Sequence, residues 1–384
     1  MISLFLASLH PGAFARSERI TGFVIGHSGY MWHNPFRILF RRDPIFAYDI
    51  YPLPPDLSDD DKRKLDRVYY PRTKDVLTDS YDLMVFHDAR IQHLTTRQLH
   101  DLDYAFREAE MAAFCGLCLG WDYAWEPTIL RDVVPISEHG SVSPHFRSYK
   151  VEFRTNLDEV FIPFITYGVE NAVGEQYTEM KVKQGATIWG DIRPYDLPWL
   201  VSWRPGGGNP GIQWVVSHIF DDWWSEQKNP YALDVATNMI LYSLEMDLIA
   251  DIPARREARR MFRNLQTQKS LILSMIEWAD NFGANSLPLS DELLDLEVEM
   301  DKAVDDYAAQ DYEPAIGFLE SMTKEVKRIS QKAVELKDRA LFWVYTSEWL
   351  VVTATAIISG LTVWSLMIKR KMHREVRATR LRRV

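Results

Sequence analysis

Cysteine is scarce in this sequence, which has two among 384 residues, Cys115 and Cys118. So few thiols exclude a module held together by several disulfides, and the core must therefore be stabilised by packing. A single C-x-x-C pair also supplies at most half of a structural zinc site. We therefore expect neither a disulfide scaffold nor a resident metal or cofactor.

Positive charge is also limited. The chain has 44 Lys and Arg against 54 Asp and Glu, and its formal net charge is -10. Proteins that bind nucleic acids present basic surfaces to the phosphates, so this balance argues against a nucleic-acid partner. Basic residues gather only at the C-terminus, where a single acid, Glu375, accompanies Lys369, Arg370, Lys371, Arg374, Arg377, Arg380, Arg382 and Arg383.

One long run carries no charge, WLVVTATAIISGLTVWSLMI from Trp349 to Ile368. A helix of this length spans about 30 Å, the thickness of the hydrocarbon core of a bilayer. We predict a transmembrane helix over residues 346–368, and the alternative is a buried core helix. The basic tail, 369–384, is then cytoplasmic by the positive-inside rule, and aromatic residues flank the other end of the run.

A cytoplasmic tail places the rest of the chain outside the membrane, as a single-pass protein of the cell envelope, and this requires an export signal. Residues 1–19 are the candidate leader because they contain a short apolar run and the sequence Ala13-Phe14-Ala15, although they lack a basic start. The alternative is a tail-anchored protein with a cytosolic head, which would require the basic tail to cross the membrane.

Residues 20–250 alternate short apolar runs with amphipathic segments, a pattern typical of an α/β domain with a mostly parallel sheet. The glycine-rich segment 204–211 joins the last two runs, which predicts an antiparallel hairpin at an edge of the sheet. Helices are expected over 95–110, where Thr95 can cap the start, and over 229–249. The predicted strands are 20–26, 45–51, 81–87, 111–117, 186–192, 198–203 and 212–218.

Residues 251–345 are charged and repeat apolar residues every three or four positions, which predicts helices. The segment 281–290 interrupts the pattern, so we expect a helical hairpin or small bundle. The last helix, from about Thr323, is expected to run into the membrane span and to act as a stalk.

A cysteine follows the fourth predicted strand at a candidate sharp turn. The segment Gly116-Leu117-Cys118-Leu119-Gly120 fits G-x-C-x-G, the thiol version of the nucleophile elbow. Glycines on both sides allow a strained strand-to-helix turn, and the start of a helix favours the thiolate form. The alternative is a buried thiol that only packs at the turn.

In its place after an apolar strand, this pentapeptide resembles the class I glutamine amidotransferases, and the resemblance covers residues 20–248. It implies a flavodoxin-like, doubly wound, mostly parallel sheet in which Cys118 is the nucleophile and His218, at the end of a late strand, is the base. The region is also similar to domains of membrane-complex subunits that keep this fold without glutaminase activity.

Two parts of the family pattern are missing. The family has H-x-E at the late strand, but here Phe220 takes the place of the acid, and the nearest acids are Asp221 and Asp222. The family's Gly-Gly turn after the third strand supplies an oxyanion donor, and here the turn reads His87-Asp88. Loss of one such donor costs about 3 kcal/mol of transition-state stabilisation.

Other candidate binding residues lie near the same strand ends. His27 follows a predicted strand, and His87 and His218 are the last residues of two others. Ligands of such folds bind at the carboxyl edge of the sheet. The alternative is a set of scattered loop histidines. Trp223 and Trp224 stand between acids and are candidates for a shelf that binds a glycan or protein, whereas the alternative is core packing.

Two functions are consistent with this sequence. The first is a membrane-anchored, outward-facing binding or scaffold module that has protein partners in a membrane complex and a glycan or peptide ligand. The alternative is a thiol-dependent amide hydrolase or amidotransferase-like enzyme that uses Cys118, His218, and Asp221 or Asp222. The missing acid and the missing Gly-Gly turn favour the first.

Overall fold

The structure is a computed structural model that describes residues 19–26, 34–53, 57–87, 89, 91–117, 125–143, 148–154, 160–165, 167, 172–218, 220 and 222–381. The chain divides into two compact units. The first, here the α/β unit, extends to Arg263 and includes Ala303–Ile316. The second, here the helical unit, comprises Asn264–Lys302 and the chain from Gly317 onward. The α/β domain that we expected to end at residue 250 thus belongs to a unit that includes parts of three later helices.

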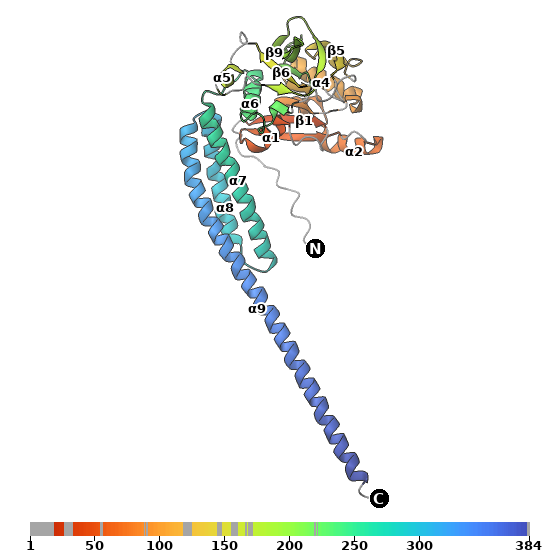
Figure 1. The fold of residues 1–384 in the computed structure, drawn as a ribbon, viewed down its shortest axis with the longest axis vertical. Helices are drawn as coiled ribbons and strands as arrows, with labels where there is room; N and C mark the ends of the chain where they lie inside the picture. The colour runs from red at the N-terminus through yellow and green to blue at the C-terminus, as the bar shows by residue number, and fades with distance from the viewer. Residues whose placement is uncertain are drawn as a thin grey trace. The chain divides into compact units, whose positions relative to one another are not determined.

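Within the described residues, the α/β unit contains a mixed nine-stranded sheet (Figure 1). Five strands at one end are parallel to one another, and every pair from there to the other end is antiparallel. Two further strands, β5 (Ile136–Val142) and β8 (Thr178–Val182), form a separate antiparallel pair. The order in the large sheet is β2 (Phe46–Pro52), β1 (Ile20–Gly26), β3 (Leu83–His87), β4 (Ala112–Gly116), β11 (Gln213–Val216), β10 (Leu197–Trp203), β9 (Thr187–Arg193), β6 (Tyr149–Phe153) and β7 (Val173–Gly174).

The sheet is covered on both faces, which explains why its parallel strands are almost continuously apolar. On one face, Val24 lies in a hydrophobic cluster with residues of α1 (Pro35–Arg42) and α6 (Ala232–Ser243). On the other, Phe23 and Ile25 pack in a second cluster with residues of three helices, α2 (Asp59–Tyr69), α3 (Lys74–Ser80) and α4 (Thr96–Glu108).

The sequence predicted the strands of the large sheet that contain apolar runs, together with the helix that Thr95 caps. Thr95 and Gln98 form a reciprocal capping box at the start of α4. The predicted hairpin of β10 and β11 is confirmed. The prediction that it forms the outermost strands of the sheet is wrong, because β11 also pairs with β4 and β10 also pairs with β9. Four strands were missed, and they are β5, β6, β7 and β8.

The remaining short elements lie in the connections of the α/β unit. They are η2 (Ile91–His93), η3 (Ile129–Asp132), α5 (Ile162–Ile165) and η4 (Asp222–Trp224).

Three long helices supply the helical unit: α7 (Ile252–Asn281), α8 (Leu287–Ala308) and α9 (Tyr312–Leu381). Within this unit they lie side by side (Figure 1), and Glu292 of α8 pairs with Arg328 and Lys332 of α9. Buried residues of α9 recur at alternating intervals of three and four, as in coiled coils: Leu319, Met322, Val326, Ile329 and Ala333. The predicted break near 281–290 is confirmed, since α7 ends at Asn281 and α8 begins at Leu287.

The C-terminal part of α9 is exposed and apolar. The helix continues without a break through the charge-free run, and Trp349, Ile358 and Trp364 are each more than half exposed. Among the described residues, α9 is the one helix long and apolar enough to cross a membrane, and none of its apolar stretch is buried. A buried core helix, the alternative considered for this run, does not describe it.

Candidate functional site

The carboxyl ends of four neighbouring parallel strands meet at one edge of the sheet. The register pairs Gly26 with His87 and Val216 with Gly116, which are the last residues of their strands. In open sheets with helices on both faces, ligands bind outside this edge. We therefore take this carboxyl edge as the candidate site.

His87 is buried at this edge and is held by Asn34. The Asn34 Oδ1 atom caps α1 by accepting hydrogen bonds from the backbone N–H groups of Phe36 and Arg37, at 3.0 and 3.2 Å. The Asn34 Nδ2 group is therefore the donor toward His87 Nδ1, 2.9 Å away. A neutral His87 ring then carries its proton on Nε2. Nδ1 is thus committed to a structural contact and is not available as a base or metal ligand.

Gly26 allows β1 to approach the third strand closely. Its φ of 151° lies in the region that favours glycine, and a Cβ atom at this position would stand 1.8 Å from the carbonyl oxygen of His87. A side chain here would push apart the two strand ends that lead into the edge.

The ends of β4 and β11 are joined through β8. The Leu117 N–H group donates to the Val216 carbonyl at 3.1 Å. Thr178 of β8 donates its hydroxyl to the Leu117 carbonyl at 3.0 Å and its N–H group to the Ser217 carbonyl at 2.5 Å. The Ser217 hydroxyl is buried and has no hydrogen-bond partner among the described residues. A buried hydroxyl is normally paired, so Ser217 is an exception among the described residues of this edge.

The predicted catalytic residues are described only in part. Cys118 and Asp221 lie outside the described residues, as does His27. Asp222 begins η4, but its side chain is also outside them. His218 follows β11 and is half-buried. The structure thus brings together the strands that precede Cys118 and His218, while the placement of the thiol stays a prediction.

Phe220, at the position of the family's acid, belongs to the core. Its side chain is 1% exposed, and its ring centroid lies 4.9 Å from that of Phe36 and 5.0 Å from that of Trp224. An aromatic ring in this environment cannot orient an imidazole as a carboxylate does. Residue 220 therefore contributes to core packing here and does not supply the acid of the H-x-E pattern.

Trp223 and Trp224 do not form an exposed shelf. They are 4% and 2% exposed, and both ring centroids lie 5.5 Å from that of Trp199 in β10. The acids beside them in the sequence suggested a surface loop, but the inward face of β10 supplies aromatic contacts that bury both rings. The expectation of a shelf is wrong, and the alternative of core packing describes these residues.

Cys115, the other cysteine, is a free thiol buried within β4, as the sequence predicted. Burial raises its pKa well above the ordinary value, because the charged thiolate is poorly solvated there. We therefore expect this thiol to be inert in the folded chain. Among the described residues no group of His, Cys, Asp and Glu side chains could hold a metal ion.

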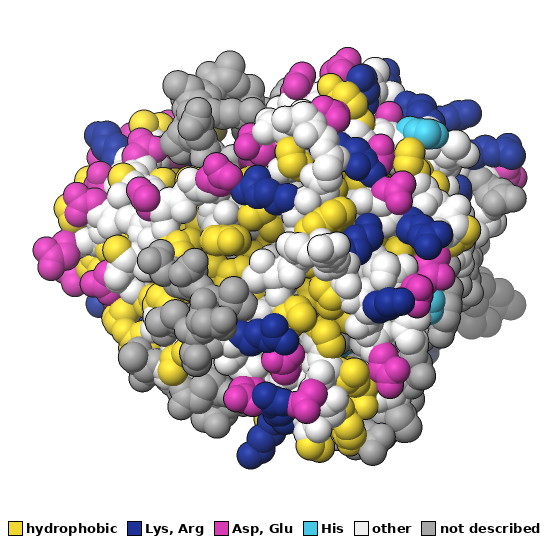
Figure 2. Space-filling model, turned by 90° about the horizontal axis from the view of Figure 1, so that it is seen from above, with side chains coloured by type: hydrophobic (Ala, Val, Ile, Leu, Met, Phe, Trp, Pro, Cys, Tyr) yellow, Lys and Arg dark blue, Asp and Glu magenta, His cyan; other side chains and the backbone are white. Residues whose placement is uncertain are grey.

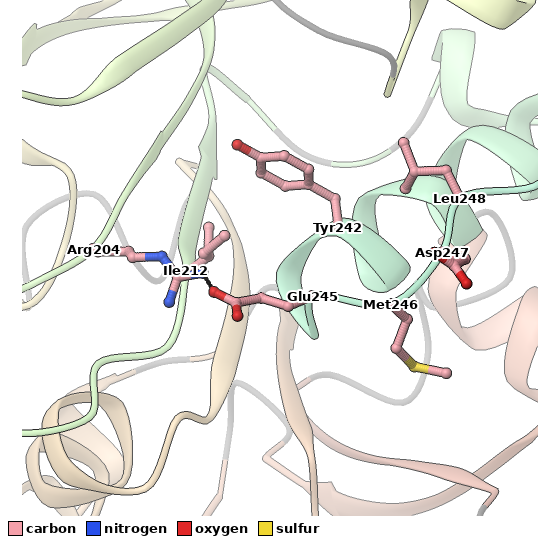
Figure 3. A pocket seen from close by; sticks show the side chains of 7 residues that line it. All are labelled: Arg204, Ile212, Tyr242, Glu245, Met246, Asp247 and Leu248. Carbon is pink, nitrogen blue, oxygen red and sulfur yellow. Dashed lines mark hydrogen bonds and ion pairs between the residues drawn. The ribbon is translucent and has the colours of Figure 1, made fainter.

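A surface hollow of about 560 Å³ lies at the opposite edge of the sheet (Figure 3). Ile212 at its wall precedes β11, so the hollow is at the amino end of that strand. Arg204 and Glu245 form an ion pair across it at 2.5 Å, and Tyr242, Met246, Asp247 and Leu248 complete the lining.

The face drawn in Figure 2 carries acidic and basic side chains interspersed, with hydrophobic side chains between them.

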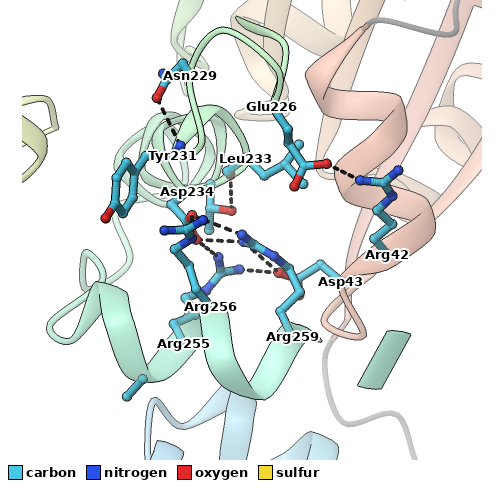
Figure 4. Close-up of polar contacts among 12 residues, drawn as sticks. Arg42, Asp43, Glu226, Asn229, Tyr231, Leu233, Asp234, Arg255, Arg256 and Arg259 are labelled. Carbon is cyan, nitrogen blue, oxygen red and sulfur yellow. Dashed lines mark hydrogen bonds and ion pairs between the residues drawn. The ribbon is translucent and has the colours of Figure 1, made fainter. Parts of the chain in front are cut away.

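Sequence reasoning missed a buried cluster of charges in the α/β unit (Figure 4). Arg255 of α7 donates to Asp43 and to Asp234, the latter at 3.0 Å, and Arg259 binds Asp234 through both terminal nitrogens. Tyr307 donates to Asp43 at 2.9 Å. Arginines four residues apart on the helix face that also carries Ala258 and Phe262 were the available signal.

The comparisons with known proteins add little to this geometry. No protein-family model and no curated protein matches the chain. A solved structure, the cytoplasmic protein STM1381 from Salmonella typhimurium LT2, is similar with a TM-score of 0.45 and 14% sequence identity. The similarity covers 58% of this chain and 99% of that one.

Proposed function

We propose that this protein is a membrane-anchored binding or scaffold module whose site is the carboxyl edge of the α/β unit. The observation that carries this proposal is Phe220, which is buried where an amidotransferase would need its orienting acid. The engagement of His87 Nδ1 by Asn34 points the same way, because it removes a second basic group from the edge.

The fold component of the proposal is a flavodoxin-like wrapping similar to that of the class I amidotransferases. The parallel half of the sheet has the order β2-β1-β3-β4-β11, and with β11 as the fifth strand this is the flavodoxin-like order 2-1-3-4-5. Hydrophobic clusters on both faces, each with its own helices, support a doubly wound sheet.

The membrane component rests on the exposed apolar part of α9. A run of this length exposed to water would be costly, whereas a bilayer would cover it. Exposed aromatic side chains, including Trp343 and Tyr345, precede the run, and exposed basic side chains, including Lys369 and Arg370, follow it. We infer a single span with a cytoplasmic tail and an outward-facing α/β unit. The partners that we propose are proteins of a membrane complex, and the proposed ligand is a peptide or glycan.

The anchor can be tested by comparing the full chain with a fragment that ends at residue 348. We expect the full chain to stay in the membrane pellet after alkaline carbonate extraction and to be released by detergent, while the fragment is soluble. A full chain that carbonate releases as readily as the fragment would exclude the span.

The absence of catalysis can be tested with one pair of proteins. We expect the full chain in detergent to release no more ammonia from glutamine or from a glutaminyl peptide than its Cys118→Ala variant does. Hydrolysis that disappears in this variant would contradict a purely binding role.

The second candidate function, thiol-dependent amide chemistry, is favoured by the strand register. Val216 pairs with Gly116, and His218 and Cys118 each stand two residues further along their chains. Parallel neighbours that end in register bring the following residues to the same edge. This function requires a Cys118 thiolate that forms below the ordinary thiol pKa of about 8.5 and depends on His218.

A further inference from the structure

The connection between α7 and α8 lies beside the part of α9 where burial ends. Within the helical unit, α7 and α9 run in the same direction (Figure 1), and the Lys337 ammonium of α9 lies 5.8 Å from the centre of the Trp278 ring in the last turn of α7. Ala340, one turn after Lys337, is the last buried residue of α9 among those that the structure describes. Residues 282–290, here the hairpin tip, therefore lie close to the level at which α9 loses its neighbours.

The level of the hairpin tip can be compared with that of the predicted membrane span. Phe282 follows Trp278 by four residues, so it lies level with a position on α9 about four residues after Lys337, which is about residue 341. The span predicted from residue 346 begins about five residues, or about 7 Å, further along the helix. The headgroup region of one leaflet is about 5–8 Å thick. The hairpin tip is thus at the height of the lipid headgroups.

Charged side chains are almost absent at this height. The hairpin tip, FGANSLPLS, contains no Lys, Arg, Asp or Glu. On α9, Glu348 is the single charged residue between positions 340 and 368. Contact with lipid therefore requires little desolvation of charge, which would be the main cost of placing these segments at a membrane.

Large apolar side chains are exposed at the same height. Phe282 is 46% exposed, and its ring centroid lies 4.4 Å from that of Trp278, while Leu287 is 70% exposed. Phe342 and Trp343 of α9 are also more than half exposed. Aromatic side chains favour the membrane–water interface, whereas water would solvate this group poorly.

We propose that the hairpin tip is a second membrane contact, in which Phe282 and Leu287 insert among the lipid headgroups beside α9. The inference rests on the membrane anchor of the proposed function, because the span brings the tip to the bilayer. A lipid surface is favoured over a protein partner because the exposed apolar side chains continue along α9 into the span itself. The contact forms only after the helical unit folds, since it requires α7 and α9 to lie together. Two contacts then fix the tilt of this unit on the membrane, which a single flexible stalk would leave free.

The test uses the full chain in phosphatidylcholine vesicles, with a nitrobenzoxadiazole label on one introduced cysteine. Cys118→Ala is the background, and Cys115 is buried, so labelling is confined to the new thiol. The probes are Phe282→Cys and Leu287→Cys. The quenchers are a phosphatidylcholine with a spin label close to the headgroup and iodide in the water.

Two further positions serve as controls. Leu271→Cys is the matched control, because Leu271 is 59% exposed on the same helix, about 16 Å before Phe282. Ile358→Cys reports the span, with a lipid that carries the spin label deep in its acyl chain.

We expect the lipid spin label to remove about half of the fluorescence at Phe282→Cys and Leu287→Cys, since side chains in the interface lie within about 5–10 Å of the headgroup boundary. Leu271→Cys should keep its fluorescence with this lipid and lose it with iodide. If both tip probes behave like Leu271→Cys while the deep label quenches Ile358→Cys, the tip contact is overturned and the anchor stands. Tip probes shielded from lipid and iodide alike would mean that a second copy of the chain covers the tip, which also overturns the lipid contact. An unquenched Ile358→Cys overturns the anchor and the tip contact together.

Discussion

Arg255 is a buried cation whose two anionic partners come from other elements of the α/β unit. Burial lowers its pKa, but the surrounding groups, above all Asp43, Tyr307 and Asp234, together outweigh burial and raise the pKa above the ordinary value. Removing one member of a buried ion pair leaves the remaining charges without compensation, which is more damaging than the loss of an exposed pair.

We expect Arg255→Met to lower the free energy of unfolding by about 3–5 kcal/mol, because Asp43 loses its closest cation and Asp234 loses one of its two buried arginines. Urea unfolding of the fragment that ends at residue 348 measures the change. The control is Arg63→Met, which breaks an exposed pair with Asp60 at 3.6 Å. Similar small losses for both variants would show that the buried cluster contributes little.

Lys183 is a partly buried lysine with a lowered pKa. Burial lowers its pKa to about 8, and the nearby Asp132 only partly opposes this shift. Its ammonium group donates to the Arg131 carbonyl at 2.7 Å and lies 4.6 Å from the centre of the Trp203 ring. The pKa in the unfolded chain is about 10.4.

Between pH 8 and about 10.4 the unfolded state therefore binds a proton that the folded state has released, so this lysine adds stability as the pH rises. Isotopic methylation of the amines and NMR titration should give one lysine near 8, and that signal should be missing in Lys183→Arg. A titration of Lys183 above 10 would contradict the expected desolvation.

Among the residues of the candidate site, the sequence predicts only those that lie at the ends of apolar strands. His87 ends β3 and His218 follows β11, as expected at the carboxyl edge, because an apolar run that ends in a polar residue marks the end of a buried strand. Thr178 and Asn34 could not be found in this way, since their roles depend on contacts between segments far apart in sequence. Trp223 and Trp224 were misjudged because neighbouring acids in a sequence do not reveal a buried turn.

At the scale of elements, the strands that are easiest to predict are those buried on both faces. β1, β3 and β4 are apolar at nearly every position, so a simple run of hydrophobic residues reveals them. β6 and β8 alternate buried and exposed residues, and β7 has only two residues. This weaker pattern does not mark them as strands. The sheet continues beyond the β10–β11 hairpin through β9, β6 and β7, so the glycine-rich connection does not mark an outermost pair of strands.

The first turns of α7 complete the core of the α/β unit. Ile252, Ala258 and Phe262 are buried there, and Arg255 and Arg259 neutralise Asp43 and Asp234. A fragment that ends at residue 250 loses all of these groups. Its two aspartates would then be buried without their cationic partners.

We expect the fragment that ends at 250 to be unfolded or insoluble, whereas the one that ends at 348 unfolds cooperatively. The loss of 3–5 kcal/mol from the broken pairs is a large part of the 5–15 kcal/mol that typically stabilises a protein. Circular dichroism and urea titration of the two fragments make the comparison. Equal urea midpoints for the α/β unit would place the domain boundary at 250 after all.

At the scale of the whole molecule, the chain combines an α/β unit with a helical unit and an exposed apolar helix. The sequence predicted this succession because the change from apolar runs to helical spacing, and then to a charge-free run, is visible without tertiary contacts. It did not predict that Ala303–Ile316 returns to the α/β unit, since a turn between two helices carries no sign of the domain it joins. The sequence also predicts the orientation across the membrane, with the α/β unit outside and the basic tail in the cytoplasm.

A glycosylation acceptor placed in the helical unit can report that orientation. The sequence has no Asn-x-Ser/Thr acceptor, but Leu287→Thr completes one with Asn285 and Ser286 between α7 and α8. Leu287 is 70% exposed, so the substitution removes little packing. Leu287→Val is the matched control because it changes the same side chain without creating an acceptor.

An outward-facing α/β unit passes through the secretory lumen of a eukaryotic cell, where this asparagine would be modified. We therefore expect Leu287→Thr, and not Leu287→Val, to gain mass that an endoglycosidase removes. An unmodified Leu287→Thr that still resists carbonate extraction would place the α/β unit in the cytosol and the basic tail across the membrane. Since eight basic residues would then have crossed the bilayer, that result would contradict the positive-inside argument for this chain while leaving the anchor intact.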